Sequence, residues 1–172
     1  MYLYPHKNEW KDDYASESSL IFSSYGEGIK LQHIGSTAVD GLFAKDCIDI
    51  LGVVEDLSEV TRRKNSMIEL GYQYKGEYGL SGREYFTKNV RKVHLHIFQE
   101  GDHNIQKHRY FVDVMRNNNQ LVEELNKLKL HLHQKYPSDK DSYQREKEHF
   151  YKQFGATQSG GIYERNYNVE HN

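Results

Sequence analysis

The segment that most constrains the fold is residues 47–54, CIDILGVV, in which Asp49 is the single charged residue. A β-branched and nearly all apolar run of this length favours a strand in the centre of a sheet. Burying a carboxylate without a partner is costly, so Asp49 needs a partner. That partner is either structural, such as backbone N–H groups or an arginine, or it is a metal ion or substrate.

The segments on either side predict a mixed sheet with helices. Residues 8–26 place Trp10, Tyr14, Ile21 and Tyr25 on one side of a helix, and residues 56–71 favour a second helix. Residues 72–99 hold short β-prone runs separated by turn residues, which predicts antiparallel hairpins. The strands that we expect in the sheet are residues 29–34, 47–54 and 93–98.

The second half of the chain predicts helices. Leu121, Leu125, Leu128 and Leu132 follow a helical period, and Pro137 ends that helix. We predict one domain over residues 1–154, of α/β (α+β) class, in which 1–100 form the sheet core and 104–154 the helical part. Residues 155–172 lack a clean period, and we expect them to be loosely attached.

Composition limits the kinds of partner. The net charge of −2 gives no basic excess of the sort that coats nucleic acid. The first residues contain no apolar stretch that resembles a signal peptide or membrane span, and the single Cys47 cannot form an intramolecular disulfide. We therefore expect a cytoplasmic protein that neither coats nucleic acid nor enters a membrane. The 14 tyrosines hint at a cleft.

A turn of small residues, Gly35, Ser36 and Thr37, follows the strand at 29–34. Such a turn lets backbone N–H groups approach an anion, and a helix starting there would add partial positive charge. The alternative is an ordinary strand-to-helix turn capped by Ser36 or Thr37, and spacing alone favours this alternative.

His94 and His96 stand two residues apart in a predicted strand, so they point to the same face. Histidines in this arrangement can bind one cation, but a third ligand is required, and Asp49 is the candidate if the two strands are neighbours. Most of the ten histidines are expected to be solvated or satisfied by a nearby carbonyl.

Four basic residues near these elements are candidates for binding phosphate oxygens: Lys45, Arg83, Lys88 and Arg109. The alternative is that they form a solvated face. Arg83 and Lys88 bracket one predicted strand and point to opposite faces if it is regular, so both serve one site only with a bulge.

Several motifs together resemble the GrpB family, also called UPF0157. They are HIGSTAV.GL.AK..IDI, VHLHIF, HRYFVDVMRNN, LVEELNKLK and YP.D...Y..EK..F, and they extend from about Tyr4 to Phe154. That family is similar in fold to the nucleotidyltransferase superfamily. The resemblance implies that Gly35 and Ser36 form a phosphate-binding turn and that Asp49 is a metal-binding strand carboxylate.

The chain departs from the superfamily pattern at the acidic residues. The usual Asp-x-Asp or Asp-x-Glu motif has Leu51 at its second position here, and His94 and His96 stand where a later carboxylate is expected. Imidazole ligands shift the preference from Mg²⁺ toward Zn²⁺, Mn²⁺ or Ni²⁺. Asp40 and Asp46 replace prolines that are common in the family. Asp46 is a poor substitute for the lost carboxylate, because three positions from Asp49 in a strand it faces the other way.

Three functions are compatible with these residues and the resemblance. The first is metal-dependent transfer of a nucleotidyl or phosphoryl group to a small acceptor. The second is a sensor that binds a nucleotide or phosphorylated metabolite without turnover, and a weaker third is metal-assisted hydrolysis. The expected catalytic residues are Asp49, Lys45 and Arg83. The expected ligands of a divalent ion (Mg, Mn or Zn) are Asp49, His94 and His96. The expected nucleotide-binding residues are Gly35, Ser36, Thr37, Lys88, Arg109, Tyr143 and Lys147.

Overall fold

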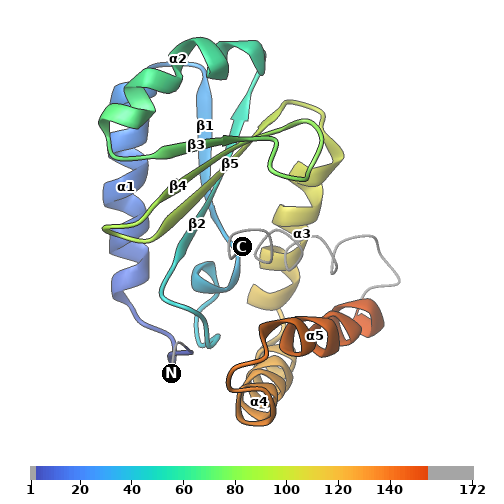
Figure 1. The fold of residues 1–172 in the computed structure, drawn as a ribbon. Coiled ribbons are helices and arrows are strands. Elements are labelled where there is room, and N and C mark those ends of the chain that lie inside the picture. Colours follow the sequence, from blue (N-terminus) through green and yellow to red (C-terminus); the bar gives the residue numbers. More distant parts are fainter. Residues whose placement is uncertain (1–2, 155–172) are drawn as a thin grey trace.

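The computed structural model describes residues 3–154, which form a five-stranded sheet with helices against both faces (Figure 1). The elements in chain order are α1 (Glu9–Tyr25), β1 (Ile29–Ile34), η1 (Ser36–Ala38), β2 (Ile48–Val54), α2 (Ser58–Glu69), β3 (Gln73–Gly76), β4 (Arg83–Lys88), β5 (Val93–Gln99), α3 (His103–Arg116), α4 (Asn119–Lys135) and α5 (Lys140–Phe154). The expectation for residues 155–172 falls outside the described residues.

The sheet has the order β1-β2-β5-β4-β3. β2 and β5 are parallel, and every other neighbouring pair is antiparallel. All seven residues of β2 are buried, which confirms the central strand expected from its apolar run. The mixed sheet and the hairpins β3–β4 and β4–β5 are confirmed as well.

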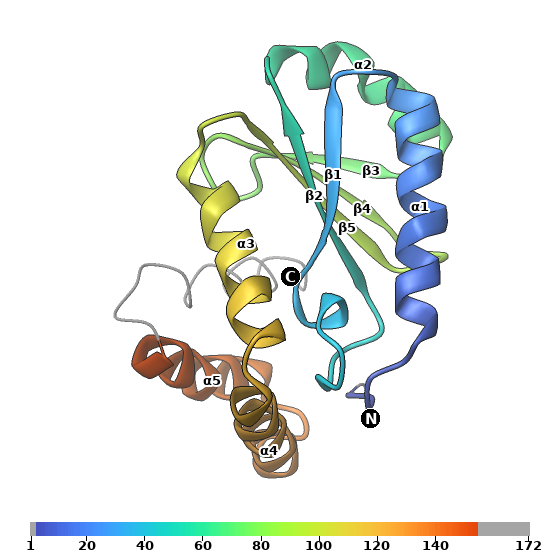
Figure 2. The ribbon, with the colours of Figure 1, turned by 180° about the vertical axis from the view of Figure 1, so that it is seen from behind.

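The two faces of the sheet are covered by different helices (Figure 2). α1 and α2 pack on one face, here called the α1 face, where Trp10, Ile50 and Phe86 belong to one hydrophobic cluster. α3 packs on the other, here called the α3 face, where Leu51, Phe98 and Val112 belong to a second cluster. Because side chains alternate along a strand, Ile50 and Leu51 reach opposite clusters from adjacent positions.

α4 and α5 pack together at one end of the sheet, beyond α3 (Figures 1 and 2). Leu125 of α4 and Tyr151 of α5 are buried members of the cluster on the α3 face. Asn126 of α4 also holds the loop before β2: its side chain accepts a hydrogen bond from the Phe43 amide and donates one to the Gly41 carbonyl. No helix within residues 3–154 is both long and apolar enough to cross a bilayer.

Candidate functional site

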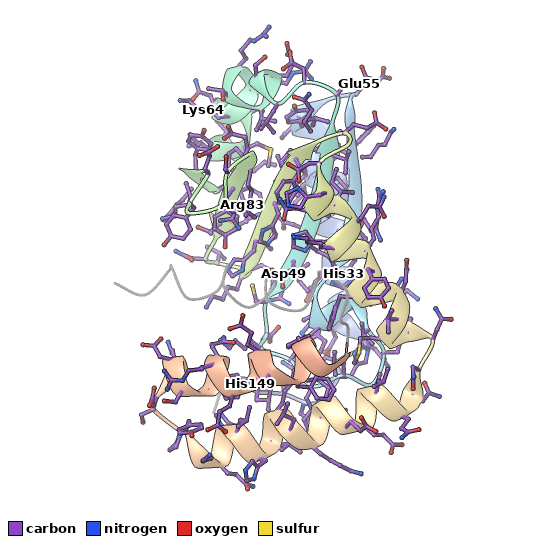
Figure 3. All side chains as sticks on the ribbon, turned by 90° about the vertical axis from the view of Figure 1, so that its right-hand side faces the viewer. His33, Asp49, Glu55, Lys64, Arg83 and His149 are labelled. Atoms are coloured by element: carbon purple, nitrogen blue, oxygen red, sulfur yellow. The ribbon has the colours of Figure 1, made fainter. Side chains whose placement is uncertain are left out.

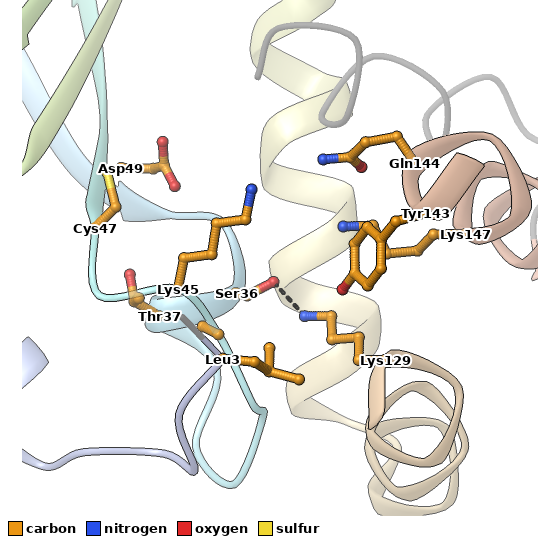
Figure 4. Close-up of a pocket in the computed structure, with 11 residues that line it drawn as sticks. Leu3, Ser36, Thr37, Lys45, Cys47, Asp49, Lys129, Tyr143, Gln144 and Lys147 are labelled. Atoms are coloured by element: carbon orange, nitrogen blue, oxygen red, sulfur yellow. Dashed lines mark hydrogen bonds between the residues drawn. The ribbon is translucent and has the colours of Figure 1, made fainter. Parts of the chain in front are cut away.

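A pocket lies where the end of the sheet meets α4 and α5 (Figure 4). Its empty volume, counted together with the open solvent at its mouth, is about 450 Å³. The lining residues are Leu3, Ser36, Thr37, Ala44, Lys45, Cys47, Asp49, Lys129, Tyr143, Gln144 and Lys147. Three of them are lysines and one is an aspartate, so the side chains of the wall carry a positive formal charge.

Gly35 brings the turn after β1 into contact with Asp49. Its φ of +73° is unfavourable for other residues, and a Cβ added to it would lie 2.8 Å from Asp49 Oδ2. β1 and β2 are paired so that Ile34 lies opposite Asp49, which places the turn directly beside the carboxylate. Glycine is therefore required here by both the backbone conformation and the space that Asp49 occupies.

The small residues after Gly35 form one short 3₁₀ turn, η1, and no longer helix follows. Any positive charge from a helix N-terminus, which was expected only if a helix follows the turn, is therefore limited to this one turn. The cap expected in the alternative is not formed, since neither the Ser36 nor the Thr37 hydroxyl caps η1. Ser36 Oγ accepts a hydrogen bond of 2.8 Å from Lys129 Nζ, and Thr37 Oγ1 lies 2.9 Å from His33 Nε2.

Asp49, His94 and His96 meet on the α3 face, because β2 and β5 are parallel neighbours with Asp49 opposite His94. Asp49 Oδ1 lies 3.4 Å from His94 Nδ1 and 3.4 Å from His96 Nε2, and all three side chains are buried. Burial alone would raise the pKa of Asp49, but the two imidazoles lower it well below its usual range. Figure 3 shows Asp49 at the end of the sheet nearest α5.

Arg83 fixes the protonation of His96. The Arg83 guanidinium, which is buried, donates to His96 Nδ1 across 3.3 Å. A guanidinium has no acceptor, so Nδ1 must accept and Nε2 must carry the proton that faces Asp49. Burial lowers the pKa of His96, in agreement with a neutral ring. Arg83 also donates to the carbonyls of Glu77 and Tyr78, and it does not line the pocket.

Cys47 completes a cluster of three possible metal ligands. The ligand atoms of Cys47, Asp49 and His94 all lie within 4.8 Å of one another, and the three residues are buried. Burial raises the pKa of the Cys47 thiol, although His94 opposes that effect. His96 is not part of this cluster.

The donor set does not fit the paired carboxylates that hold Mg²⁺ in nucleotidyltransferases. Asp49 is the single carboxylate among the residues that line the pocket. Leu51 points into the hydrophobic cluster, and Asp46 is bound by Lys7, Trp10 and Arg91 near α1. Mg²⁺ prefers several oxygen ligands, so these residues do not offer its usual site.

The structure separates the basic residues expected to bind phosphate. Lys45 lines the pocket, as do Tyr143 and Lys147 of α5. Lys88 does not: it lies on the α1 face, where its Nζ is 2.8 Å from Glu17 Oε1, because β4 is regular and turns Arg83 and Lys88 to opposite faces. Arg109 of α3 donates to Gln32 and is also outside the pocket.

The site residues expected from the sequence did not include Lys129, Cys47 or Gln144 of the pocket wall. Lys129 is 3% exposed and donates to Ser36 Oγ and to the Phe43 carbonyl. The sequence pattern could have identified Lys129 as a buried lysine, because it lies four positions after Leu125 and three before Leu132, on the apolar stripe of α4. A lysine at such a position is buried only if its charge has acceptors.

Comparison with solved structures establishes the fold. A crystal structure of Cid1 poly(U) polymerase superposes with a TM-score of 0.58 at 13% identity, over 86% of this chain and 51% of that one. A cytoplasmic RNA terminal U-transferase gives a TM-score of 0.55 at 12% identity. At these identities the likeness shows the nucleotidyltransferase-like fold alone, and this confirms the expected fold class.

Sequence comparison establishes the family. The family model described as GrpB protein matches residues 1–156. The Glutamate-rich protein GrpB of Alkalihalophilus pseudofirmus is 36% identical over 156 residues, which are 86% of this chain and 90% of that protein. UPF0157 protein YqkA of Bacillus subtilis is 32% identical over 80% of this chain but only 41% of its own length. The crystal structure of GrpB from Enterococcus faecalis has a TM-score of 0.79 at 31% identity, over 84% of this chain and 90% of that one. The chain therefore belongs to the GrpB family.

Proposed function

We propose that this GrpB protein binds a small phosphate-bearing ligand, a nucleotide, in the pocket between the turn at Gly35 and α5. The observation that carries the proposal is the convergence of Lys45, Lys129 and Lys147 on one pocket whose single carboxylate is Asp49. Lysine ammonium groups bind phosphate oxygens as point charges, and a partly enclosed pocket strengthens that attraction.

The three lysines come from separate parts of the chain. Lys45 stands in the loop before β2, Lys129 on α4 and Lys147 on α5, and Figure 4 shows Lys45 extending toward the pocket from the side opposite Lys147. Lys147 lies over the ring of Tyr143 at 4.6 Å. A ligand in this pocket would therefore meet cations on both sides, which suits the several oxygens of a phosphate chain.

The fold supports a nucleotide as the ligand. Crystal structures of Cid1 contain a UTP analogue or MgATP, so a protein of this fold class binds nucleoside triphosphates. The departure at Leu51 favours binding over the two-metal transfer that the fold family implies, since the second carboxylate is replaced by a side chain of the hydrophobic cluster.

Transfer of a nucleotidyl or phosphoryl group is the second candidate function. It is favoured by one observation: Asp49, whose pKa is held low by the neighbouring histidines, reaches the pocket wall in an ionised state. Incubation with nucleoside triphosphates and a divalent ion distinguishes the two functions. Release of pyrophosphate or transfer of phosphate would favour the enzyme, and unchanged nucleotide with measurable binding would favour the sensor.

The first test is a thermal-shift screen of nucleoside triphosphates with and without Mg²⁺, Mn²⁺ or Zn²⁺, since a ligand that binds the native state raises its apparent stability. Isothermal titration then compares wild type with Lys147→Met. We expect binding to weaken by about 1.5–3 kcal/mol, the usual range for a hydrogen bond to a charged group. The matched control is Lys88→Met, which should bind as wild type. Equal binding by all three proteins, or no binding by wild type, would contradict the proposal.

Two substitutions examine the turn and the aspartate. Asp49→Asn keeps the shape and removes the charge, so any metal-dependent part of the binding should fall by about 1.5–3 kcal/mol. Ser36→Leu should block the approach of an anion to the turn. Because Ser36 accepts a hydrogen bond from the buried Lys129, this change also lowers stability, so a folded population must be shown by circular dichroism before binding is compared.

A further inference from the structure

Cys47, Asp49 and His94 place three different kinds of donor around one point. A thiol, a carboxylate and an imidazole lie with their ligand atoms within 4.8 Å of one another, and each residue is less than 6% exposed. Cys47 and Asp49 also line the pocket, so two of the three residues of this cluster belong to its wall (Figure 4). Asp49 of β2 and His94 of β5 are held opposite each other by two parallel strands, and Cys47 directly precedes β2.

His96 lies beside this cluster but is prepared for a different task. Its Nδ1 accepts from Arg83, so its Nε2 carries a proton and points at Asp49 Oδ1 across 3.4 Å. A protonated nitrogen has no lone pair to offer a cation. His96 is therefore a hydrogen-bond donor that orients the Asp49 carboxylate, the arrangement in which a neighbouring residue positions a metal ligand.

We infer that Cys47, Asp49 and His94 form a binding site for one zinc-class ion and not for Mg²⁺. Thiolate and imidazole donors suit Zn²⁺, whereas Mg²⁺ demands oxygen ligands. With bonds of about 2.0–2.3 Å at tetrahedral angles, two ligands on one zinc lie about 3.2–3.8 Å apart. The ligand atoms, which lie within 4.8 Å of one another, must move closer together to reach that spacing.

The position of the ion would follow from the walls of the site. Three protein ligands leave a fourth tetrahedral position, and the two ligands that line the pocket direct it toward the pocket. The Gly35 backbone lies so close to Asp49 Oδ2 that no side chain fits between them. An ion held there would meet a pocket ligand directly, which would make this an open site.

The experiment is a titration of the metal-free, tag-free protein with Co²⁺, followed by displacement with Zn²⁺. Wild type should bind one Co²⁺ and show a thiolate-to-cobalt charge-transfer absorption, which must arise from Cys47 because the chain has one cysteine. Zn²⁺ should remove the absorption, and excess Mg²⁺ should not. Absence of the band in wild type would overturn the inference without any variant.

Variants assign the ligands. Cys47→Ser should lose the charge-transfer band, and His94→Gln and Asp49→Asn should weaken binding by more than the ~10–100-fold typical of losing a residue that only positions a ligand. His96→Gln should weaken it no more than that and keep the band at saturation. If His96→Gln abolished binding while Cys47→Ser retained it, the ligand set would be Asp49 with the two histidines, and the inference would be wrong.

The inference of a metal site and the proposal of nucleotide binding can be contradicted by separate results. Lys147 is not a member of the cluster, so Lys147→Met should leave Co²⁺ binding unchanged while it weakens nucleotide binding. If the protein binds Co²⁺ through Cys47 but binds no nucleotide, the metal site stands and the proposed function is wrong. If it binds nucleotide but shows no Co²⁺ binding through Cys47, the proposed function stands and the metal site is wrong.

Discussion

The two faces of the sheet use buried charge in different ways. On the α1 face, the charged groups bind one another: Glu17 accepts from both Tyr72 and Lys88, at 2.6 and 2.8 Å, inside an otherwise apolar cluster. On the α3 face, Asp49 and its histidines lie beside a pocket that is open to ligands. The first arrangement is closed and the second borders an opening.

That difference separates stability from binding. A buried ion pair whose partners satisfy each other adds little to function, and breaking it destabilises the protein. A carboxylate beside an open pocket can accept a new partner. Substitutions on the α1 face should therefore change mainly the free energy of unfolding, and substitutions in the pocket should change mainly the ligand affinity.

The largest expected effect is on the α1 face, at Trp10. Its side chain is fully buried, and its indole donates to Asp46 across 2.9 Å. Trp10→Ala should lower the free energy of unfolding by about 3–5 kcal/mol, the usual range for an aromatic residue in a core. Urea denaturation measures this change. A loss below about 1 kcal/mol would mean that α1 contributes little to the core, and the comparison of the faces would fail.

Lys88→Met should lower stability by about 2–3 kcal/mol, because it leaves Glu17 buried without its cation. The value is below that of a fully buried pair since Lys88 keeps 15% of its side chain exposed. Urea denaturation gives the stability, and nucleotide titration gives the affinity, which should not change.

Lys147→Met is the matched opposite of Lys88→Met. The same chemical change in the pocket wall should alter affinity more than stability. If both variants lost nucleotide binding equally, Lys88 would belong to the site after all, and the two faces would not divide the roles.

Gly35→Ala should cost about 1–3 kcal/mol, because its backbone conformation is nearly exclusive to glycine. The added Cβ would also displace Asp49, so the variant should lose Co²⁺ affinity. Gly28→Ala is the control: Gly28 also has positive φ, but nothing lies within 4 Å of its added Cβ. Gly28→Ala should lose stability and keep Co²⁺ affinity, as equilibrium titration would show.

The smallest effect concerns pH and His33. Burial against Tyr14 lowers the pKa of His33 from 6.5 to about 4. As the pH falls, His33 therefore binds a proton in the unfolded chain before it does so in the folded protein. The contribution of the neutral His33 to the free energy of unfolding is complete above pH 6.5 and is lost as the pH falls toward 4. Between pH 7 and pH 4.5 wild type should lose about 2 kcal/mol more than His33→Asn. Urea denaturation at both pH values measures the difference, and parallel losses would contradict the assignment.

Local patterns in the sequence were sufficient for the strands and for part of the cluster. The apolar run at 47–54 defined the central strand, and the two-residue period placed His94 and His96 on one face. Their proximity to Asp49 depended on β2 and β5 being neighbours, which the structure shows. That step required the sheet order, and the period of a single strand does not contain it.

The remaining parts of the site depend on tertiary contacts. The two-residue period of a strand predicted that Arg83 and Lys88 point to opposite faces of the sheet. It did not predict which face holds the pocket. Lys129 reaches Ser36 from 93 residues away, and Cys47 enters the cluster through its contact with a different strand. The pattern of polar and apolar residues within one segment does not predict these two contacts, because each depends on how the intervening chain folds.

The loop of residues 36–46 is tied at several points, and this bears on the entropy of binding. Tyr4 exchanges two backbone hydrogen bonds with Ala44, Arg116 donates twice to the Ala38 carbonyl, and Asn126 and Lys129 hold the segment from α4. A ligand that docks against a loop already ordered by folding loses little further conformational freedom. Because folding has already ordered the loop, a larger part of the free energy of each ligand contact should contribute to the binding affinity.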